Sequence, residues 1–324
     1  MSSAGAAGLV LRDLASVRLR SRGRTGAVAA TVPRDALPLS DADVAVLICD
    51  GALAVRDGRR YVTGVLAAGA LFADVRLPAG DGLLAGLSAR GVHYVAGLPR
   101  GRAAGYARAA YAFHRLPRRA PSEAEVASYG VALEAVSGRL PGYTPELSAD
   151  GYWQRWRHRR LDAHAWPRHK VYVSPLPCDL VEVLGAMARV CESLEVPALK
   201  VVRYPGEAVR ADKLVAYCDD DAAAARLARE VSAALTGARV HGVPFAGQVD
   251  PSGLVGRAVD PGPEWVTAEP LSWRRLVARR IARSLGTDAR GSVAERARFV
   301  YGRLLLDGID PIAGRFTAPG AVAG

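Results

Sequence analysis

The sequence lacks the motifs that bring a metal or a nucleotide to a protein. Its 324 residues contain no GxxxxGK[ST] phosphate loop, no HExxH helix and no GxSxG elbow. The four cysteines have no CxxC spacing, and the six histidines have no metal-ligating neighbours at suitable spacing. These absences argue against P-loop nucleotide hydrolases, zinc enzymes and serine hydrolases. We therefore expect a site without metal or cofactor, and the scattered thiols fit a reducing cytoplasm.

Long hydrophobic runs are missing too. The longest apolar stretch, VTGVLAAGALFADV at residues 62–75, is interrupted by glycine. It is also shorter than the roughly 20 apolar residues that span a bilayer. The first residues, MSSAGAAGLVLRDL, lack the charged and apolar regions of a signal peptide. We expect no contact with a membrane and a cytoplasmic location.

Aromatic side chains are scarce, at 6 % of the chain, although half of the residues are apolar. Alanine, glycine, valine and leucine must therefore fill most of the core. The formal net charge is +11, which favours polyanions, acidic peptides or phosphorylated substrates as partners. The evidence for nucleic acid as the polyanion is weak, because an arginine-rich composition raises the net charge whatever the partner is.

The pattern of elements changes near residue 145. Helical patterns predominate before it, and Ser122 and Glu125 form a capping-box pattern that predicts the start of a helix. After it the order is strand, helix, strand, strand, helix, strand at residues 238–247, and then helices. This order is typical of an α+β fold with a mainly antiparallel sheet flanked by helices. We predict a mainly helical N-terminal region, residues 1–145, that binds a peptide or partner, and an α+β domain, residues 146–324.

The segment from His169 to Cys218 carries five cations on or beside its strand patterns. The two-residue period of a strand places Lys170 and Tyr172 on one face of their strand, and it places Lys213 on the same face as Val215 and Tyr217. If the strand faces coincide, the lysines and Tyr172 converge with a loop arginine and form a phosphate site. The alternative is a polar outer sheet face lined by solvated lysines, which spacing alone does not exclude. The five cations are Lys170, Lys200, Arg203, Arg210 and Lys213.

Residues 152–170 combine aromatic and basic side chains. They could stack on and pair with a nucleic acid, or they could bind an acidic peptide. They could also form an amphipathic segment whose tryptophans are core and whose arginines are solvated. The candidate peptide-binding residues of this segment are Trp153, Arg155, Trp156, Arg157 and Arg159.

The order HKVYVSP, helix, LKVVRYP and VRADKLVAYC resembles the core of phosphothreonine lyases. A closer resemblance is to the HopA1 effector-like family, which shares the RADKLVAY strand, the GVPF segment at residues 242–245, the AVDP run that ends at Pro261, the Ser272-Trp273 pair and the GID turn at residues 308–310. The resemblance covers about residues 105–318. It implies that residues 146–324 form a phosphothreonine-lyase-like domain. Members of the family also occur in bacterial gene clusters for ribosomally made, modified peptides, including lanthipeptides and thioamitides.

The resemblance implies roles for individual residues. Lys200 matches the general-base lysine of the lyases, and Lys170 matches a phosphate-contacting lysine. Arg210 or Lys213 falls near a phosphate-binding arginine, and Arg203 stands beside them. The position of the general-acid histidine holds Tyr172 instead, whose phenol is a weaker acid. Candidates for a second phosphate-binding arginine are Arg257 and Arg279.

The function implied is a metal-independent lyase. It would remove phosphate from phosphoserine or phosphothreonine of a ribosomal precursor peptide and leave dehydroalanine or dehydrobutyrine. Its partners would be a phosphorylated precursor with its leader and a separate kinase-like protein, since the chain has no kinase motif. The alternative is a catalytically inactive scaffold of the same fold that binds a peptide or a kinase. Nucleic-acid binding through the tryptophan and arginine run is a third hypothesis.

Overall fold

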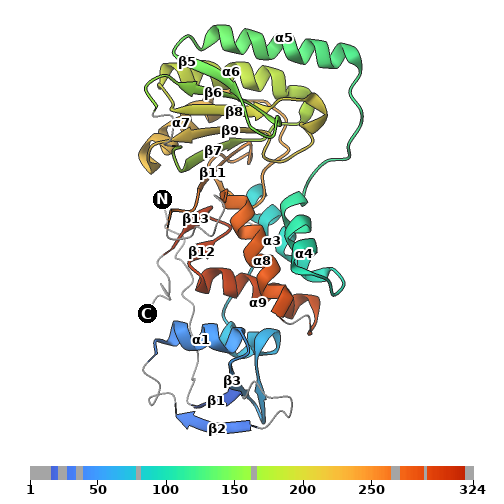
Figure 1. Cartoon of the computed structure of the whole chain (residues 1–324), viewed down its shortest axis with the longest axis vertical. Helices are drawn as coiled ribbons and strands as arrows, with labels where there is room; N and C mark the ends of the chain where they lie inside the picture. The colour runs from blue at the N-terminus through green and yellow to red at the C-terminus, as the bar shows by residue number, and fades with distance from the viewer. Residues whose placement is uncertain are drawn as a thin grey trace.

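The structure is a computed structural model that describes residues 16–20, 28–33, 39–77, 82–161, 166–263, 271–287 and 290–317. A large sheet with its helices lies at one end of the molecule, a small sheet lies at the other, and a group of helices lies between them (Figure 1). The fold is α+β, and its large sheet is antiparallel throughout and covered by helices, which confirms the fold class predicted from the order of elements.

The large sheet has seven strands in the order β10-β11-β7-β9-β8-β6-β5. The strands at its centre come from the segment that carries the lysines. In chain order the strands are β5 (Tyr143–Leu147), β6 (Trp153–His158), β7 (His169–Val173), β8 (Ala198–Val202), β9 (Leu214–Cys218), β10 (Gly247–Gln248) and β11 (Val255–Val259).

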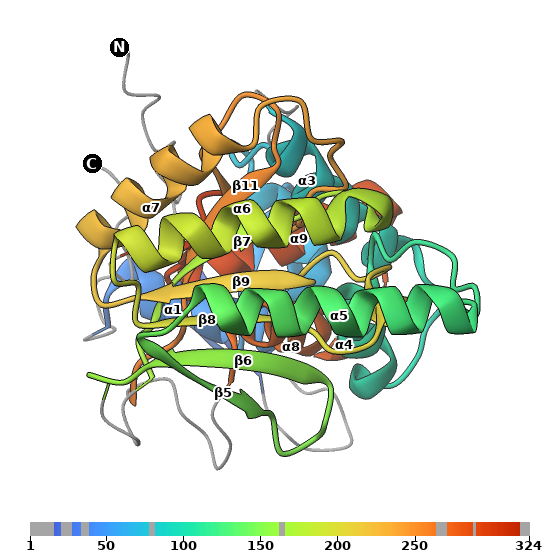
Figure 2. The same ribbon diagram turned by 90° about the horizontal axis from the view of Figure 1, so that it is seen from above.

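Helices α5 (Glu123–Arg139), α6 (Leu180–Ser193) and α7 (Asp221–Ala234) lie along one face of this sheet (Figures 1 and 2). The start of α5 is the capping box predicted from the sequence. Ser122 accepts a hydrogen bond from the backbone N–H of Glu125, and the Glu125 carboxylate accepts one from the backbone N–H of Ser122 at 2.8 Å. The predicted helix start at this position is confirmed.

The opposite face of the sheet packs on helices from both halves of the chain. They are α3 (Leu83–Gly97), α4 (Ala103–Ala112), α8 (Trp273–Thr287) and α9 (Val293–Leu306), and α4 lies beside α8. One hydrophobic cluster joins Leu84 and Leu87 of α3, Tyr172 and Tyr217 of the sheet, and Trp273 of α8. The sheet therefore has two different faces, one under α5–α7 and one that meets this helical group.

The first part of the chain forms a small unit against α9. Its sheet has the order β2-β1-β3-β4, and its core contains Ile48, Leu71 and Phe72 together with Phe299 and Leu306 of α9. Its elements are β1 (Ser16–Arg20), β2 (Val28–Pro33), α1 (Asp41–Cys49), β3 (Leu53–Asp57), β4 (Arg60–Val62) and α2 (Ala68–Leu71), and a ribbon of β12 (Ile309–Asp310) and β13 (Arg315–Phe316) follows α9. The division of the chain at residue 145 stays a prediction.

The segment 238–247, which we expected to be a strand, is mostly irregular; Val240 makes an isolated bridge to Pro175, and Gly247 begins the short strand β10. The strands at this edge of the sheet are β11, which pairs with β7, and β10, which pairs with β11. Among the described residues, no helix has the length and apolar character that crossing a membrane requires.

Candidate active site

A cavity of about 290 Å³ opens between the large sheet, the end of α4 and the start of α8. Its walls carry the carboxylates of Asp150 and Asp212 and the rings of Tyr111, Trp153 and Tyr172. Cations outnumber carboxylates in these walls, so the cavity suits an anion. The cationic side chains that line it are Arg155, Lys170, Lys200, Arg210, Arg274 and Arg275.

Strand register explains why the sheet contributes so many of these side chains. Arg155 of β6 is paired with Lys200 of β8, Lys200 with Val215 of β9, and Val215 with Tyr172 of β7. Residues paired in this way point to the same face. A single row across four strands therefore carries three of the polar side chains of the cavity. Lys170 lies two residues before Tyr172 and faces the same way.

Lysine itself is rare here. Of the 43 cationic residues in the chain, only Lys170, Lys200 and Lys213 are lysines. Arginine does not lose its proton at ordinary pH, whereas a lysine amine can act as a base. Only these three cationic side chains can therefore take a proton from a substrate, and their surroundings decide which one does.

Lys170 is held as a charged group. Its side chain is 3 % exposed, and its ammonium lies 2.6 Å from a carboxylate oxygen of Asp260. Burial works to lower the pKa of Lys170, but the Asp260 carboxylate, together with Tyr217 and Tyr172, holds that pKa well above its ordinary value. Lys170 can hold an anion, and it is unsuited to accept a proton.

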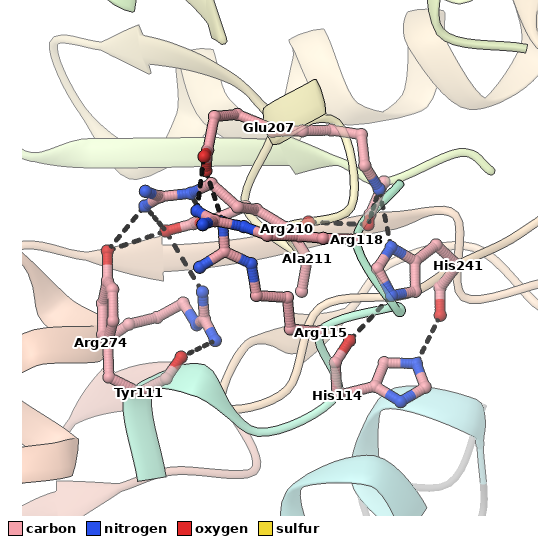
Figure 3. A network of polar contacts seen from close by, with 12 residues as sticks. Tyr111, His114, Arg115, Arg118, Glu207, Arg210, Ala211, His241 and Arg274 are labelled. Atoms are coloured by element: carbon pink, nitrogen blue, oxygen red, sulfur yellow. Dashed lines mark hydrogen bonds and ion pairs between the residues drawn. The ribbon is translucent and has the colours of Figure 1, made fainter. Parts of the chain in front are cut away.

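Lys213 lies outside the cavity, in contrast to the convergence expected from the sequence. Its ammonium donates to the backbone oxygen of Pro175 at 2.8 Å and contacts His241 Nδ1 at 2.7 Å. Burial lowers the pKa of Lys213 to about 7. Figure 3 shows His241 paired with His114, each ring Nε2 donating to the backbone oxygen of the other at 2.8 Å. Lys213 therefore joins the end of the sheet to the segment after α4.

Lys200 is the lysine that faces the cavity without a carboxylate at ion-pair distance in the described part of the chain. Its amine lies 4.2 Å from the centre of the Trp153 ring and 5.2 Å from that of Tyr217. Its position matches that of the base expected from the sequence, although the role itself stays a prediction.

Tyr217 was not among the site residues predicted from the sequence. It is paired with Lys170 across β7 and β9, and the Lys170 ammonium lies 4.9 Å from its ring centre. Burial works to raise the pKa of Tyr217, but the ammonium groups of Lys170 and Lys200 hold that pKa below its ordinary value. The alternation of β9 placed Tyr217 on the face of Val215. Its place between two lysines depends on register, which the sequence does not give.

Tyr172 has a different environment although it lies on the same face. Its side chain is buried, and this burial raises the pKa of the phenol above its ordinary value while Lys170 works to lower it. The hydroxyl therefore keeps its proton at neutral pH. It is available as a donor, and it is a weaker acid than an exposed tyrosine.

Arginines of the cavity are held by one buried carboxylate. Arg210 Nε lies 3.0 Å and Arg274 Nη1 lies 3.1 Å from Asp212, and the Tyr111 hydroxyl donates to Asp212 at 3.0 Å. Arg210 Nη2 in turn donates to the Tyr111 hydroxyl at 3.0 Å. Figure 3 shows Tyr111, Arg210 and Arg274 turned toward one another, and on the far side of Arg210 it shows Arg115 and Arg118 bound to Glu207.

These contacts fix the charges of the arginine group. Burial works to raise the pKa of Asp212, but Arg274 and Arg210 hold it far below its ordinary range. Asp212 neutralises one of the two guanidinium groups and leaves one positive charge. The Nε atoms of Arg155 and Arg274 are buried and find no hydrogen-bond partner among the described residues. A bound anion is the kind of hydrogen-bond acceptor that would satisfy such unpaired N–H donors.

The other predicted phosphate-binding residues lie elsewhere. Arg203 is exposed beyond the end of β8, and its backbone N–H donates to Tyr152. Arg257 of β11 lies 3.6 Å from the Asp221 carboxylate. Arg279 is exposed on α8 and lines a separate groove. None of the three lines the cavity.

The predicted peptide-binding residues do not all lie on one surface, because residues 153–158 form β6 and its side chains alternate between the two faces of the sheet. Trp153 and Arg155 line the cavity, and the Arg155 guanidinium lies 5.2 Å from the Trp166 ring. Trp156 is core, and its indole N–H donates to Ser137 at 2.8 Å. The remaining two are Arg157, which lies 3.8 Å from Glu146, and Arg159, which is exposed.

Several residues that line the cavity or hold its side chains were missed by sequence reasoning. Arg274 and Arg275 directly follow the Ser272-Trp273 pair, and Asp260 lies within the AVDP run, so both motifs were noticed without these side chains. Asp212 lies within the RADKLVAY motif, which was also noticed without that side chain, and Tyr111 had no signal beyond its polarity. Among the described residues, no group of three histidine, cysteine or acidic side chains could hold a metal ion.

Comparison with known proteins gives matches only among solved structures. No family model matches the chain, and no curated protein matches it significantly. An effector protein from Pseudomonas syringae pv. tomato strain DC3000 matches at 15 % identity with a TM-score of 0.49, over 69 % of this chain and 95 % of that one. An effector protein from Pseudomonas syringae pv. syringae strain 61 matches at 14 % identity with a TM-score of 0.48, over 75 % and 100 %.

A third match is the phosphothreonine lyase SpvC, an effector protein from Salmonella, at 10 % identity with a TM-score of 0.33, over 60 % of this chain and 95 % of that one. Effectors and phosphothreonine lyases are the kinds of protein that the sequence resemblance names. Similarity at this level does not identify the reaction of this chain. The side chains of the cavity have to do so.

Proposed function

We propose that the protein is a lyase that eliminates phosphate from phosphoserine or phosphothreonine of a peptide, leaving dehydroalanine or dehydrobutyrine. The observation that carries this proposal is the composition of the cavity. It brings together an amine base, Lys200, a charged lysine, Lys170, and two arginines, Arg210 and Arg274, around about 290 Å³. A phosphoserine or phosphothreonine residue uses all of these groups, because its phosphate dianion meets the cations and its acidic Cα–H bond meets the base.

The proposed reaction is a β-elimination. Lys170, Arg210 and Arg274 hold the phosphate oxygens by charge-assisted hydrogen bonds. The Lys200 amine takes the proton from Cα, and the electron pair of that C–H bond forms the Cα–Cβ double bond. The Cβ–O bond breaks at the same time, and its electrons leave with the phosphate. Tyr172 donates a proton to the departing oxygen.

The choice of Lys200 as base follows from the other two lysines. Lys170 is held charged by Asp260 at 2.6 Å. Lys213 has a pKa of about 7, which would suit a base, but its amine is directed to Pro175 and His241 outside the cavity. A base must reach the proton it abstracts, so geometry takes precedence over pKa. Lys200 is the lysine that meets this condition.

The finer part of the proposal concerns the substrate. We propose a ribosomal precursor peptide that a separate kinase-like protein phosphorylates first. The resemblance of the sequence motifs to lyases of modified-peptide gene clusters supports this, as does the lack of a phosphate loop or kinase motif in the chain. The test is incubation with a phosphopeptide followed by mass spectrometry. Elimination gives the dehydro residue, whereas a phosphatase would give free serine or threonine.

Substitution of Tyr172 tests the proton donor. Tyr172→Phe is expected to lower kcat about 100-fold, within the range of general acid–base catalysis, and to leave KM within about twofold. Tyr172→His is expected to restore part of the loss, because an imidazolium is a stronger acid than a buried phenol. The measurement is initial rates of dehydro product with both variants. Full activity of Tyr172→Phe would assign proton donation to another group.

One observation favours a second candidate, a non-catalytic scaffold of this fold that binds phosphopeptide. Burial raises the pKa of Tyr172, which weakens it as an acid. A protein that binds phosphopeptide with micromolar affinity and never forms dehydro product, even with the kinase present, would favour the scaffold over the lyase.

A further inference from the structure

An open groove of about 570 Å³ lies between α4 and α8, separate from the cavity. The two helices run side by side in both ribbon views (Figures 1 and 2). Small residues of both helices line the groove, among them Ala104, Ala107 and Ala282. Arg279 and Arg283 of α8 line it as well. The groove therefore combines apolar surface with cationic side chains.

The arginines of the groove continue from the active-site cavity. Arg275 lines the cavity, and Arg279 and Arg283 follow it at four-residue intervals on the exposed side of α8. Four residues of an α-helix rise about 6 Å. Residues of an extended peptide that point to the same side are also about 6.5 Å apart. An extended chain leaving the cavity would thus bring every second side chain to the next arginine.

Charge at this surface has one sign along both helices. The α4 segment, residues 103–112, and the α8 segment, residues 273–287, contain no aspartate or glutamate. Arg108 of α4 is exposed as well. Acidic side chains that could repel an anionic ligand are therefore missing from the two helices that form the groove.

We propose that this groove binds an acidic stretch of the peptide substrate, with carboxylates at alternate positions from the phosphorylated residue meeting Arg275, Arg279 and Arg283. The inference rests on the proposed function for its starting point, the phosphate in the cavity. An extended peptide fits better than a nucleic acid, because alanine methyl groups offer contact to side-chain carbons and nothing on which a base could stack. A peptide in this groove would also contact α4, which belongs to the N-terminal region predicted to bind a peptide or partner.

The experiment compares two phosphopeptides, each in an acidic and a neutral form. One carries glutamate at the second and fourth positions before the phosphoresidue, the other at the same positions after it, and glutamine replaces glutamate in the neutral forms. For one of the two acidic peptides we expect KM about tenfold below that of its neutral form, with kcat unchanged. The Arg279→Gln/Arg283→Gln double variant is expected to abolish this difference.

The matched control is Arg226→Gln/Arg229→Gln, which removes the same charge from exposed positions of α7 on the other face of the sheet. It is expected to keep the tenfold preference. Equal KM values for acidic and neutral peptides in both directions would overturn the groove proposal and leave the lyase proposal standing. A preference that the Arg279/Arg283 double variant retains would overturn it too.

Binding of the unphosphorylated acidic peptides, measured by fluorescence anisotropy, separates the two proposals. If no elimination occurs with any peptide, the lyase proposal fails, and weaker anisotropy binding to the Arg279/Arg283 variant than to the control still supports the groove. A DNA or RNA oligomer that binds more tightly than the acidic peptide, and that the groove variant alone loses, would contradict a peptide occupant.

Discussion

Lys200→Ala is expected to lower kcat for elimination by about 1,000-fold, within the range assigned to general acid–base catalysis. The reason is chemical: Lys170 is held charged by Asp260, Lys213 is directed out of the cavity, and arginine does not accept a proton. Removal of the Lys200 amine therefore leaves no side-chain amine that can take the α-proton. The measurement is single-turnover formation of dehydro product from a phosphopeptide.

Lys200→Arg is the companion variant, because it keeps the positive charge and removes the base. We expect it to bind phosphopeptide within about threefold of the unsubstituted protein and to be as slow as the alanine variant. Rapid elimination by either variant would show that the proton goes elsewhere, and the assignment of the base would then be wrong. Loss of binding in both variants would instead make Lys200 a phosphate ligand.

Asp212→Ala is expected to destabilise the fold and to weaken the substrate complex together. The carboxylate is 10 % exposed and holds the side chains of Arg210 and Arg274, which are 18 % and 3 % exposed. Removing one partner of a buried ion pair costs about 3–5 kcal/mol, because it leaves an uncompensated charge. We therefore expect the free energy of unfolding in urea to fall by that amount and KM to rise.

A surface ion pair provides the matched control for this experiment. Asp221 lies 3.6 Å from Arg257, and its side chain is 73 % exposed. Asp221→Ala is expected to change the free energy of unfolding by less than about 1 kcal/mol, since exposed pairs contribute little. Equal losses of unfolding free energy in the two variants would show that Asp212 does not hold a buried group of arginines, and they would contradict this role.

Alternation along strands predicted which of the lysine and tyrosine side chains share the face that lines the cavity, apart from Lys213. The period of two placed Lys170 and Tyr172 on one face, and the register of β7, β9 and β8 brings that face together with Lys200. The same rule did not place Lys213, because β9 begins at Leu214 and the side chain of Lys213 turns toward His241. Periodicity applies within a strand and gives no direction for the residue before it.

Contacts between distant segments explain the rest of what the sequence did not reveal. Tyr111 comes from α4 and Arg274 from α8, and both reach Asp212 because α4 and α8 pack together under the sheet. No local pattern encodes that packing. The hairpin of β5 and β6 was also missed, since its first strand lies in a turn-rich stretch and its second reads as a basic, aromatic run.

The mass of the product formed from a phosphoserine peptide tests the central claim most directly. After incubation with the unsubstituted protein, the account predicts a peptide that has lost phosphoric acid and that then adds a thiol at the dehydroalanine. The Lys200→Ala variant should leave the phosphopeptide intact under the same conditions. A product that carries free serine and adds no thiol would contradict the account, because it would make the protein a phosphatase.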